Sequence, residues 1–279
     1  MRQQAVRGDL LAPRFHDDAR TWKHWAWMVA NALQAAFTVL WTGGLGLIVM
    51  PMHAITGNRQ WALGMASRWW APGLLAGAGV QLRVEGLENV DWSRNHVLVA
   101  NHQSIIDICA LFRAVPAPLH FLLKQEMTRM PLVGRYARAM GMIFIERGKR
   151  HAAASFLHDA TRLVRAGDNL CIFPEGTRSR NGVVGAFKGG AFQVAMDAGV
   201  DVVPVAVSGS GAVLPSDTLF RVRPGVIRVS FGIPLATEGL VGARDRQRLV
   251  VRAHAAVIGM LAAQSRVQRD DDSRIVEGG

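Results

Sequence analysis

A long stretch near the start of the chain contains no charged side chain. Residues 25–58 lack Asp, Glu, Lys and Arg altogether, and residues 26–52 form the most apolar part. Such a stretch has to leave water, either for a protein core or for a lipid bilayer, because exposed apolar surface is costly. Its length is sufficient for one tilted transmembrane helix. We therefore expect residues 1–74 to form a leader followed by membrane-associated helices.

Four helix-breaking residues interrupt this apolar stretch: Gly43, Gly44, Gly46 and Pro51. They leave two arrangements open, a single span and two shorter helices that dip into one leaflet. A buried hydrophobic hairpin in a water-soluble protein is the third alternative. A secretory signal peptide fits poorly, because the segment before the apolar stretch is long and contains three aspartates.

The charge of the chain narrows the class of partner. The formal net charge is +11, which attracts polyanions such as nucleic acid, an anionic membrane face or a phosphorylated substrate. All eight tryptophans lie in the first third of the sequence, beside the apolar stretch, which is typical of a membrane interface. We therefore expect a bilayer as partner and no nucleic acid. A basic membrane- or nucleic-acid-binding protein without catalysis is the alternative of another class.

After residue 74, short runs rich in Val, Ile, Leu and Phe alternate with helical stretches. This alternation predicts an α/β domain at residues 75–264, with a mostly parallel sheet covered by helices and functional residues where strands end. The proline at position 204 indicates an edge strand or a bulge. The polar residues 265–279 are expected to form a mobile tail. The predicted strands are 80–84, 96–100, 119–123, 142–146, 170–173, 202–208 and 226–231, and the predicted helices are 105–114, 151–166 and 188–198.

The two cysteines lie in apolar runs. Neither Cys109 nor Cys171 has another Cys or a His at metal-ligand spacing. We expect two reduced, buried thiols, no metal site and no disulfide, as in a catalytic domain on the cytoplasmic side of the cytoplasmic membrane.

A histidine and an aspartate follow the predicted strand 96–100. His102 comes directly after that strand, and Asp107 lies five residues later in the first turns of the next helix. A loop at this place can fold the two side chains together. An imidazole can then take a proton from an alcohol, while a carboxylate on its other nitrogen fixes the tautomer. The pair resembles a serine hydrolase triad without its serine, so the substrate hydroxyl would be the nucleophile.

Two further loops combine strand ends with charge. The segment Phe-Pro-Glu-Gly-Thr-Arg-Ser at 173–179 joins turn formers to Glu175 and Arg178. A guanidinium grips a phosphate with a planar fork, while Glu175 and Thr177 can bind glycerol oxygens or hold the loop, and Gly176 permits close backbone approach. The segment at 141–147 ends in Arg147, a second candidate phosphate ligand. An ordinary turn with solvated charges is the plain alternative for each loop.

Together these segments resemble the glycerolipid acyltransferases, the family of 1-acylglycerol-3-phosphate and glycerol-3-phosphate acyltransferases. The family pattern N-H-x-S-x-x-D is matched at 101–107, and F-P-E-G-T-R-S at 173–179. The pattern G-x-I-F-I-D-R is matched at 141–147 except that Glu146 replaces Asp, and V-P-V-A-I is closely matched at 203–207. The resemblance spans residues 80–231.

This resemblance implies a function and a set of roles. His102 and Asp107 would be catalytic, and Lys124, Arg147, Glu175, Gly176, Thr177 and Arg178 would bind the acceptor. The implied reaction transfers an acyl group from acyl-CoA or acyl-carrier protein to the sn-2 hydroxyl of lysophosphatidic acid, without metal or organic cofactor. Glycerol-3-phosphate, another lysophospholipid and a lyso-aminolipid lacking phosphate are the alternative acceptors.

Overall fold

The fold is built on one seven-stranded sheet. The computed structural model describes residues 18–130, 133–146, 150–179, 182–218 and 221–277. The strand order is β1-β7-β6-β2-β5-β3-β4, and neighbouring strands are parallel except for β6 and β7. The predicted α/β class with a mostly parallel sheet is confirmed. The strands are β1 Val80–Glu85, β2 Val97–Ala100, β3 Leu119–Lys124, β4 Ile143–Ile145, β5 Asn169–Ile172, β6 Val202–Ser208 and β7 Gly225–Phe231.

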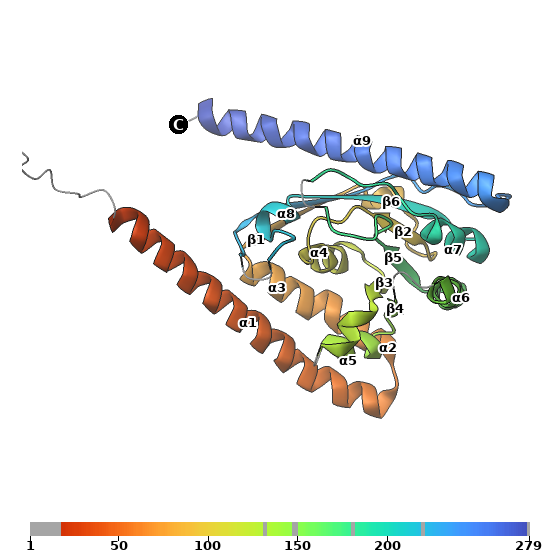
Figure 1. Ribbon diagram of the computed structural model, residues 1–279, viewed down its shortest axis with the longest axis horizontal. Helices are drawn as coiled ribbons and strands as arrows, with labels where there is room; N and C mark the ends of the chain where they lie inside the picture. The colour runs from red at the N-terminus through yellow and green to blue at the C-terminus, as the bar shows by residue number, and fades with distance from the viewer. Residues whose placement is uncertain (1–17, 131–132, 147–149, 180–181, 219–220, 278–279) are drawn as a thin grey trace, which may run out of the picture.

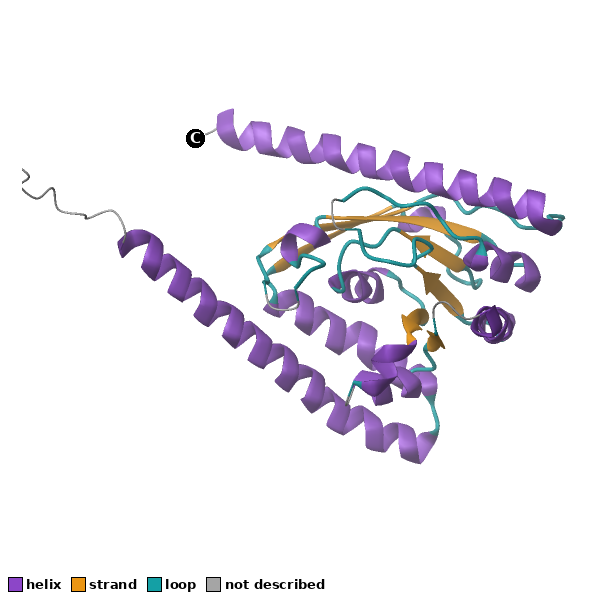
Figure 2. Cartoon of the chain, in the orientation of Figure 1, coloured by secondary structure: helices purple, strands orange, loops and turns teal. Residues whose placement is uncertain are grey.

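Helices cover both faces of this sheet (Figures 1 and 2). One layer holds α1 Asp18–Thr56, α2 Arg59–Met65, the π-helix η1 Ala66–Trp70, α3 Ala71–Gly77, α4 Ile106–Ala114 and α5 Val133–Ala139. The other layer holds α6 Arg150–Arg165, α7 Gly190–Ala198 and α9 Gly242–Glu277. The short elements η2 Leu87–Asn89, η3 Gln125–Arg129 and α8 Ser210–Val213 lie in connections.

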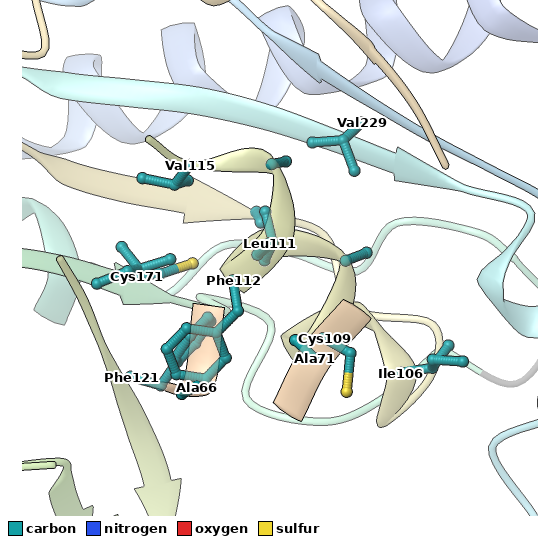
Figure 3. Packing of buried hydrophobic residues seen from close by; sticks show 14 of the residues in the cluster. Ala66, Ala71, Ile106, Cys109, Leu111, Phe112, Val115, Phe121, Cys171 and Val229 are labelled. Atoms are coloured by element: carbon teal, nitrogen blue, oxygen red, sulfur yellow. The ribbon is translucent and has the colours of Figure 1, made fainter. Parts of the chain in front are cut away.

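Each central strand contributes side chains to two separate cores. In β2, Leu98 and Ala100 belong to the core under α4, whereas Val97 and Val99 belong to the core under α6, α7 and α9. Figure 3 shows the first of these cores, where Phe112 of α4 lies against Phe121 of β3 with ring centroids 4.9 Å apart. A strand buried on both faces is apolar throughout and does not alternate with polar residues. This explains why a short apolar run marked the central strands in the sequence, whereas the edge strand β1 alternates between apolar and polar residues.

The long helix α1 packs along the body through polar and aromatic contacts. Trp41 donates its indole N–H to the Trp70 carbonyl at 3.2 Å, and Trp70 donates to the Thr42 hydroxyl at 3.1 Å. The amide oxygen of Asn31 accepts the Val222 backbone N–H at 2.7 Å. The boundary predicted at residue 74 falls inside α3, and α2, η1 and α3 share one core with the sheet. The N-terminal helices are therefore a layer of the same body.

The opposite side of α1 is apolar and exposed. Leu33, Leu40 and Leu47 recur every seven residues on this side and are 67–75% exposed, and Ile55 near its end is 80% exposed. The stretch Trp25–Thr56 is long and apolar enough to cross a membrane, and little of it is buried. The helix therefore joins a face that packs on protein to a face that has no protein cover in the described part of the chain.

Two expectations from the sequence differ from the structure. Pro204 does not mark an edge, because β6 lies between β2 and β7. The bulge alternative fits instead, because Val205 pairs with Phe231 but Val202 pairs with Leu235, so two residues of β6 lie opposite three of the neighbouring segment, and the Pro204 carbonyl accepts the Gly232 N–H at 2.9 Å. Residues 265–277, expected as a tail, continue α9 instead. The helix continues through this polar segment after Gln264. The side-chain N–H of Gln264 donates to the Ser230 hydroxyl of β7 at 2.7 Å.

Candidate active site

The site begins where β2 ends, and its first residue fixes the loop that follows. Asn101 donates its side-chain N–H to the Val207 carbonyl and accepts the Val207 N–H, both at 2.8 Å. This amide therefore pairs with the β6 backbone as another strand residue would. Asn101 is buried, so both bonds are shielded from water. The loop after β2 is consequently anchored on the neighbouring strand before the chain reaches His102.

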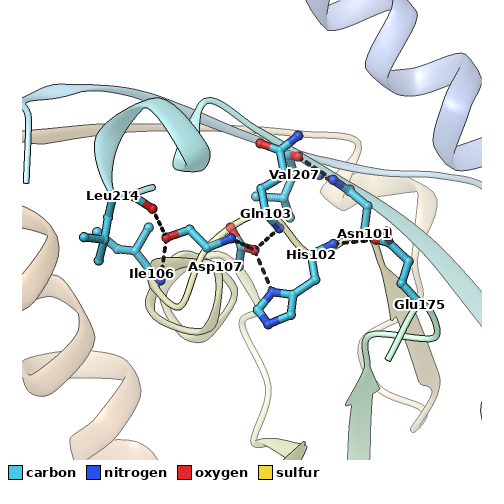
Figure 4. A network of polar contacts seen from close by, with 9 residues as sticks. Asn101, His102, Gln103, Ile106, Asp107, Glu175, Val207 and Leu214 are labelled. Atoms are coloured by element: carbon cyan, nitrogen blue, oxygen red, sulfur yellow. Dashed lines mark hydrogen bonds and ion pairs between the residues drawn. The ribbon is translucent and has the colours of Figure 1, made fainter. Parts of the chain in front are cut away.

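His102 and Asp107 meet as their spacing predicted (Figure 4). The His102 Nδ1 lies 2.8 Å from the Asp107 Oδ2, which also accepts the backbone N–H groups of Gln103 at 2.8 Å and Ser104 at 2.9 Å. Asp107 is fully buried, and the His102 side chain is 16% exposed. A carboxylate in this position accepts a hydrogen bond from the protonated Nδ1, which favours the neutral tautomer whose Nε2 carries a free lone pair. The pair can therefore act as a general base.

The imidazole ring is held flat by an aromatic neighbour. The ring of Phe173 stacks on His102 with centroids 3.9 Å apart and an interplanar angle of 14°. On the far side of the loop, the Ser104 hydroxyl donates to the Leu214 carbonyl at 2.5 Å. These contacts fix both the ring and the turn between His102 and Asp107, so little conformational freedom remains to be lost when a substrate binds.

Glu175 ties the second loop to the first. One carboxylate oxygen accepts the His102 backbone N–H at 2.8 Å, and the other accepts the Gly185 N–H at 2.8 Å. The His102 carbonyl in turn accepts the Ser179 N–H at 2.7 Å. Glu175 is buried. Of its two suggested roles, holding the loop and binding a glycerol oxygen, this geometry therefore favours the first.

A cation that the sequence interpretation missed lies over the same loop. Gly176 has φ +76°, and a Cβ placed on it would come within 2.7 Å of the Lys188 Nζ. The Lys188 backbone N–H donates to the Pro174 carbonyl at 2.9 Å, which holds that residue against the loop. Lys188, Thr177 and Arg178 are exposed. The absence of a side chain at Gly176 therefore makes room for an ammonium group beside Arg178.

The remaining candidate ligands follow neighbouring strands of the same sheet edge. Lys124 ends β3 and is exposed, and it lies in register with Ile145 of β4. Arg147 lies outside the described residues, two positions after Ile145. Because β5 lies between β2 and β3, the 173–179 loop stands between His102 and Lys124. Carboxyl ends of parallel strands meet at one edge, where ligands bind in open α/β sheets.

Neither cysteine is a competing nucleophile at this site. Cys109 and Cys171 are buried free thiols, as predicted. Burial, and to a smaller extent the nearby Asp107 carboxylate, raises the pKa of Cys109 to about 12, and the same causes raise the pKa of Cys171. A thiol with so high a pKa is protonated at neutral pH and unreactive. The described residues include no group of three or more His, Cys, Asp or Glu placed to hold a metal ion.

Comparison with known proteins agrees with this geometry. The Acyltransferase family model matches residues 81–208, the segment that contains His102, Asp107 and the 173–179 loop. This part of the chain therefore resembles an acyltransferase domain. The crystal structure of the 1-acyl-sn-glycerophosphate (LPA) acyltransferase PlsC from Thermotoga maritima resembles it with a TM-score of 0.69 and 26% identity, over 87% of this chain and 98% of that one.

Two curated acyltransferase sequences are also similar to this chain. The chloroplastic 1-acyl-sn-glycerol-3-phosphate acyltransferase LPAT1 of Arabidopsis thaliana is 34% identical over 156 residues, 56% of this chain. The beta form of Homo sapiens is 32% identical over 180 residues, 64% of each chain. The chain spans 44% of the plant relative's length. The kinship with glycerolipid acyltransferases predicted from the motifs is confirmed.

Proposed function

We propose that this protein transfers a fatty acyl group from an acyl thioester to the free sn-2 hydroxyl of 1-acylglycerol-3-phosphate, which gives phosphatidic acid. The observation that carries the proposal is the His102–Asp107 pair, joined at 2.8 Å at the carboxyl end of β2 within an acyltransferase domain. The names of the Arabidopsis and human relatives support this choice of acceptor, since both are 1-acyl-sn-glycerol-3-phosphate acyltransferases.

The proposed chemistry needs one base and no covalent enzyme intermediate. His102 Nε2 takes the proton of the acceptor hydroxyl while its oxygen attacks the thioester carbonyl carbon. The tetrahedral intermediate then expels the thiolate, which takes the proton back from the imidazolium. Asp107, buried and bonded to Nδ1, stabilises the imidazolium between these steps. The thioester is already activated, so the reaction as proposed uses no metal or organic cofactor.

The acceptor phosphate is proposed to bind the cations at the same sheet edge. Lys188 lies against Gly176, Arg178 follows two residues later in the same loop, and in the sequence Lys124 and Arg147 follow the next two strands. A charge-assisted hydrogen bond to phosphate contributes more than a neutral one, and a guanidinium adds two-point geometry. A cluster of this kind would orient the sn-2 hydroxyl toward His102. Glycerol-3-phosphate has the same phosphate, so it stays the alternative acceptor.

The position of the protein on the membrane is proposed from the length and the contacts of α1. The 32-residue stretch Trp25–Thr56 is about 48 Å long at helical rise, which exceeds the roughly 30 Å hydrocarbon core. Its contacts at Asn31, Trp41 and Thr42 run along the body, which carries the polar site. Lying in one leaflet, with Leu33, Leu40 and Leu47 toward lipid, satisfies both faces of the helix. We place the catalytic body on the cytoplasmic side of the cytoplasmic membrane.

The test is an acyl-transfer assay with purified full-length protein in mixed micelles. Labelled acyl-CoA and acyl-carrier protein are each paired with lysophosphatidic acid, glycerol-3-phosphate and lysophosphatidylcholine. We expect labelled phosphatidic acid from lysophosphatidic acid with at least one donor, and little product from lysophosphatidylcholine, which lacks a phosphomonoester. Preferential acylation of glycerol-3-phosphate or lysophosphatidylcholine would refute the proposed acceptor, and no transfer to any acceptor from either donor would refute the proposed reaction.

A further inference from the structure

A second polar hollow lies at the opposite edge of the sheet from His102. It has a volume of about 620 Å³, and residues 141–144, which lead into β4, line it together with Asp168 just before β5. Three arginines from three different helices also line it, namely Arg59 of α2, Arg138 of α5 and Arg162 of α6. We call it the Arg59–Arg138 hollow. Because β4 and β5 lead from this edge toward the candidate active site, the two sites are separated by the length of the strands.

The two carboxylates of the hollow already have partners. Asp168 accepts the Gln60 side-chain N–H at 3.1 Å, and its Oδ1 lies 3.5 Å from Nε2 of the buried His120. Asp159 lies 3.7 Å from the guanidinium of Arg162, one turn away on α6. Asp168 keeps its negative charge in these contacts and also acts electrostatically on Arg59, so the two carboxylates offset part, but not all, of the positive charge of the three arginines.

Arg59 and Arg138 retain their positive charge. Within the described ranges neither of them has a carboxylate within 4.0 Å, and Arg138 makes only a long hydrogen bond of 3.4 Å to the Thr128 carbonyl. Gly141 gives Arg59 its place, because a Cβ there would lie 3.2 Å from the Arg59 Cδ and 3.5 Å from its Nη1. Three guanidinium groups (Arg59, Arg138 and Arg162) face two carboxylates (Asp159 and Asp168), so the hollow carries one excess positive charge, which favours an anion with several oxygens.

The position of Arg59 indicates which anion is available to the hollow. Arg59 begins α2, three residues after α1 ends at Thr56, and the nearby Ile55 is 80% exposed. If the apolar side of α1 lies in lipid, Arg59 stands where the lipid headgroups begin. Basic side chains at this depth attract anionic lipids by about 1 kcal/mol each.

We infer that the Arg59–Arg138 hollow binds the phosphate headgroup of an anionic membrane phospholipid and so fixes the protein on the bilayer. The inference rests on the proposed membrane position of α1 and is independent of the proposed acyl transfer. The occupant is a lipid rather than free phosphate, because α1 delivers the hollow to the headgroup layer. Arg59 and Arg138 are binding residues for this lipid and take no part in the chemistry at His102.

The test compares two charge-matched double variants of the full chain. Arg59→Gln with Arg138→Gln removes two cations of the hollow, and Arg266→Gln with Arg269→Gln removes two exposed cations on α9, in the other layer. Binding is measured on phosphatidylcholine vesicles with and without phosphatidylglycerol. We expect the first variant to lose about tenfold in affinity for phosphatidylglycerol vesicles and the second to lose less than about threefold. Binding to pure phosphatidylcholine should stay equal in both.

Three results would overturn the inference. Equal losses in both variants would mean that the general positive field of the protein attracts the vesicles, and no loss in the first would mean that the hollow takes no headgroup. Inorganic phosphate is the remaining arm: if its NMR line broadens with wild type but not with the first variant, while vesicle binding is unchanged, the hollow takes free phosphate. Melting curves verify that both variants fold.

Acyl transfer in detergent micelles is measured on the same two variants. We expect both to retain wild-type activity, because the hollow lies at the other end of the strands. A folded first variant that loses transfer in micelles would contradict the assignment of Arg59 and Arg138 to lipid anchoring. If wild type itself shows no transfer in micelles, the proposed function fails, while the vesicle comparison still decides the headgroup site.

Discussion

His102 is held at its ring, its backbone N–H and its backbone carbonyl by four residues. Asp107 and Phe173 fix the ring, Glu175 accepts the N–H, and Ser179 donates to the carbonyl. The short sequence distance between His102 and Asp107 made their meeting predictable. The contact of Lys188 with Gly176 was not, because twelve positions of loop separate them and only the folded path brings them together. Glu175 likewise accepts the Gly185 N–H, a contact that no local sequence pattern predicts.

Lys188 gives a prediction for acceptor binding. Replacing it by Met removes an ammonium group beside Arg178, so the KM for lysophosphatidic acid should rise roughly tenfold or more, the value of one charge-assisted hydrogen bond. The KM for the acyl thioester should change little, and Lys188→Arg should restore most of the affinity. Steady-state kinetics with each substrate varied in turn separates the two constants.

Arg244→Met, on the exposed surface of α9, is the matched control for removing one cation. It should leave both constants near wild type. If Lys188→Met raised both constants equally, or if Lys188→Arg behaved like Met, Lys188 would hold the loop instead of the phosphate.

The elements of the fold followed closely from sequence because most strands are buried on both faces. Each predicted strand agrees with the observed one to within one residue at either end. Of the two alternatives for Pro204, the edge strand is wrong and the bulge fits, since the pairing register shifts by one residue between Val205–Phe231 and Val202–Leu235. Side-chain contacts between the elements could not be predicted from the sequence. Asp168 before β5, for example, contacts His120 of β3 and Gln60 of α2, and these residues are far apart along the chain.

Asp168 gives a prediction for acid stability. Its hydrogen bond with His120, then its other bonds and charges, hold the pKa of Asp168 below its usual value of 3.8, although burial opposes this. A carboxyl whose pKa is lowered by folding stabilises the protein at pH above its usual pKa, and this contribution disappears as the pH falls through the folded pKa. The free energy should be under about 1 kcal/mol, since Asp168 is partly exposed to solvent.

Urea unfolding of wild type and Asp168→Asn between pH 7 and pH 3 tests this. The difference in free energy of unfolding should be largest at neutral pH and shrink below about pH 4. Asp217→Asn, at an exposed position, is the control and should show no such trend. A difference for Asp168→Asn that stays constant over the whole range would contradict the account.

At the scale of the whole molecule, the charge-free N-terminal stretch and the catalytic sheet form one body. The sequence showed that residues 25–58 must avoid water, but it could not show that one face of α1 packs on α3 and α5, because this depends on distant partners such as Trp70 and Val222. The result is a layered molecule with α1 along one outer side (Figure 1), and α1 exposes apolar side chains such as Leu33, Leu40 and Leu47. Under the proposed function, a protein of this shape would take its lipid acceptor from the membrane without leaving it.

The central claim is that His102 is the base in acyl transfer to lysophosphatidic acid. The direct measurement is the rate of phosphatidic acid formation by purified His102→Ala, with His158→Ala, an exposed histidine of α6, as the matched control. Both variants should melt close to wild type. We predict that His102→Ala loses at least about a thousandfold in kcat, as expected when a general base is removed, while His158→Ala keeps wild-type activity. Near-wild-type transfer by folded His102→Ala would contradict the account.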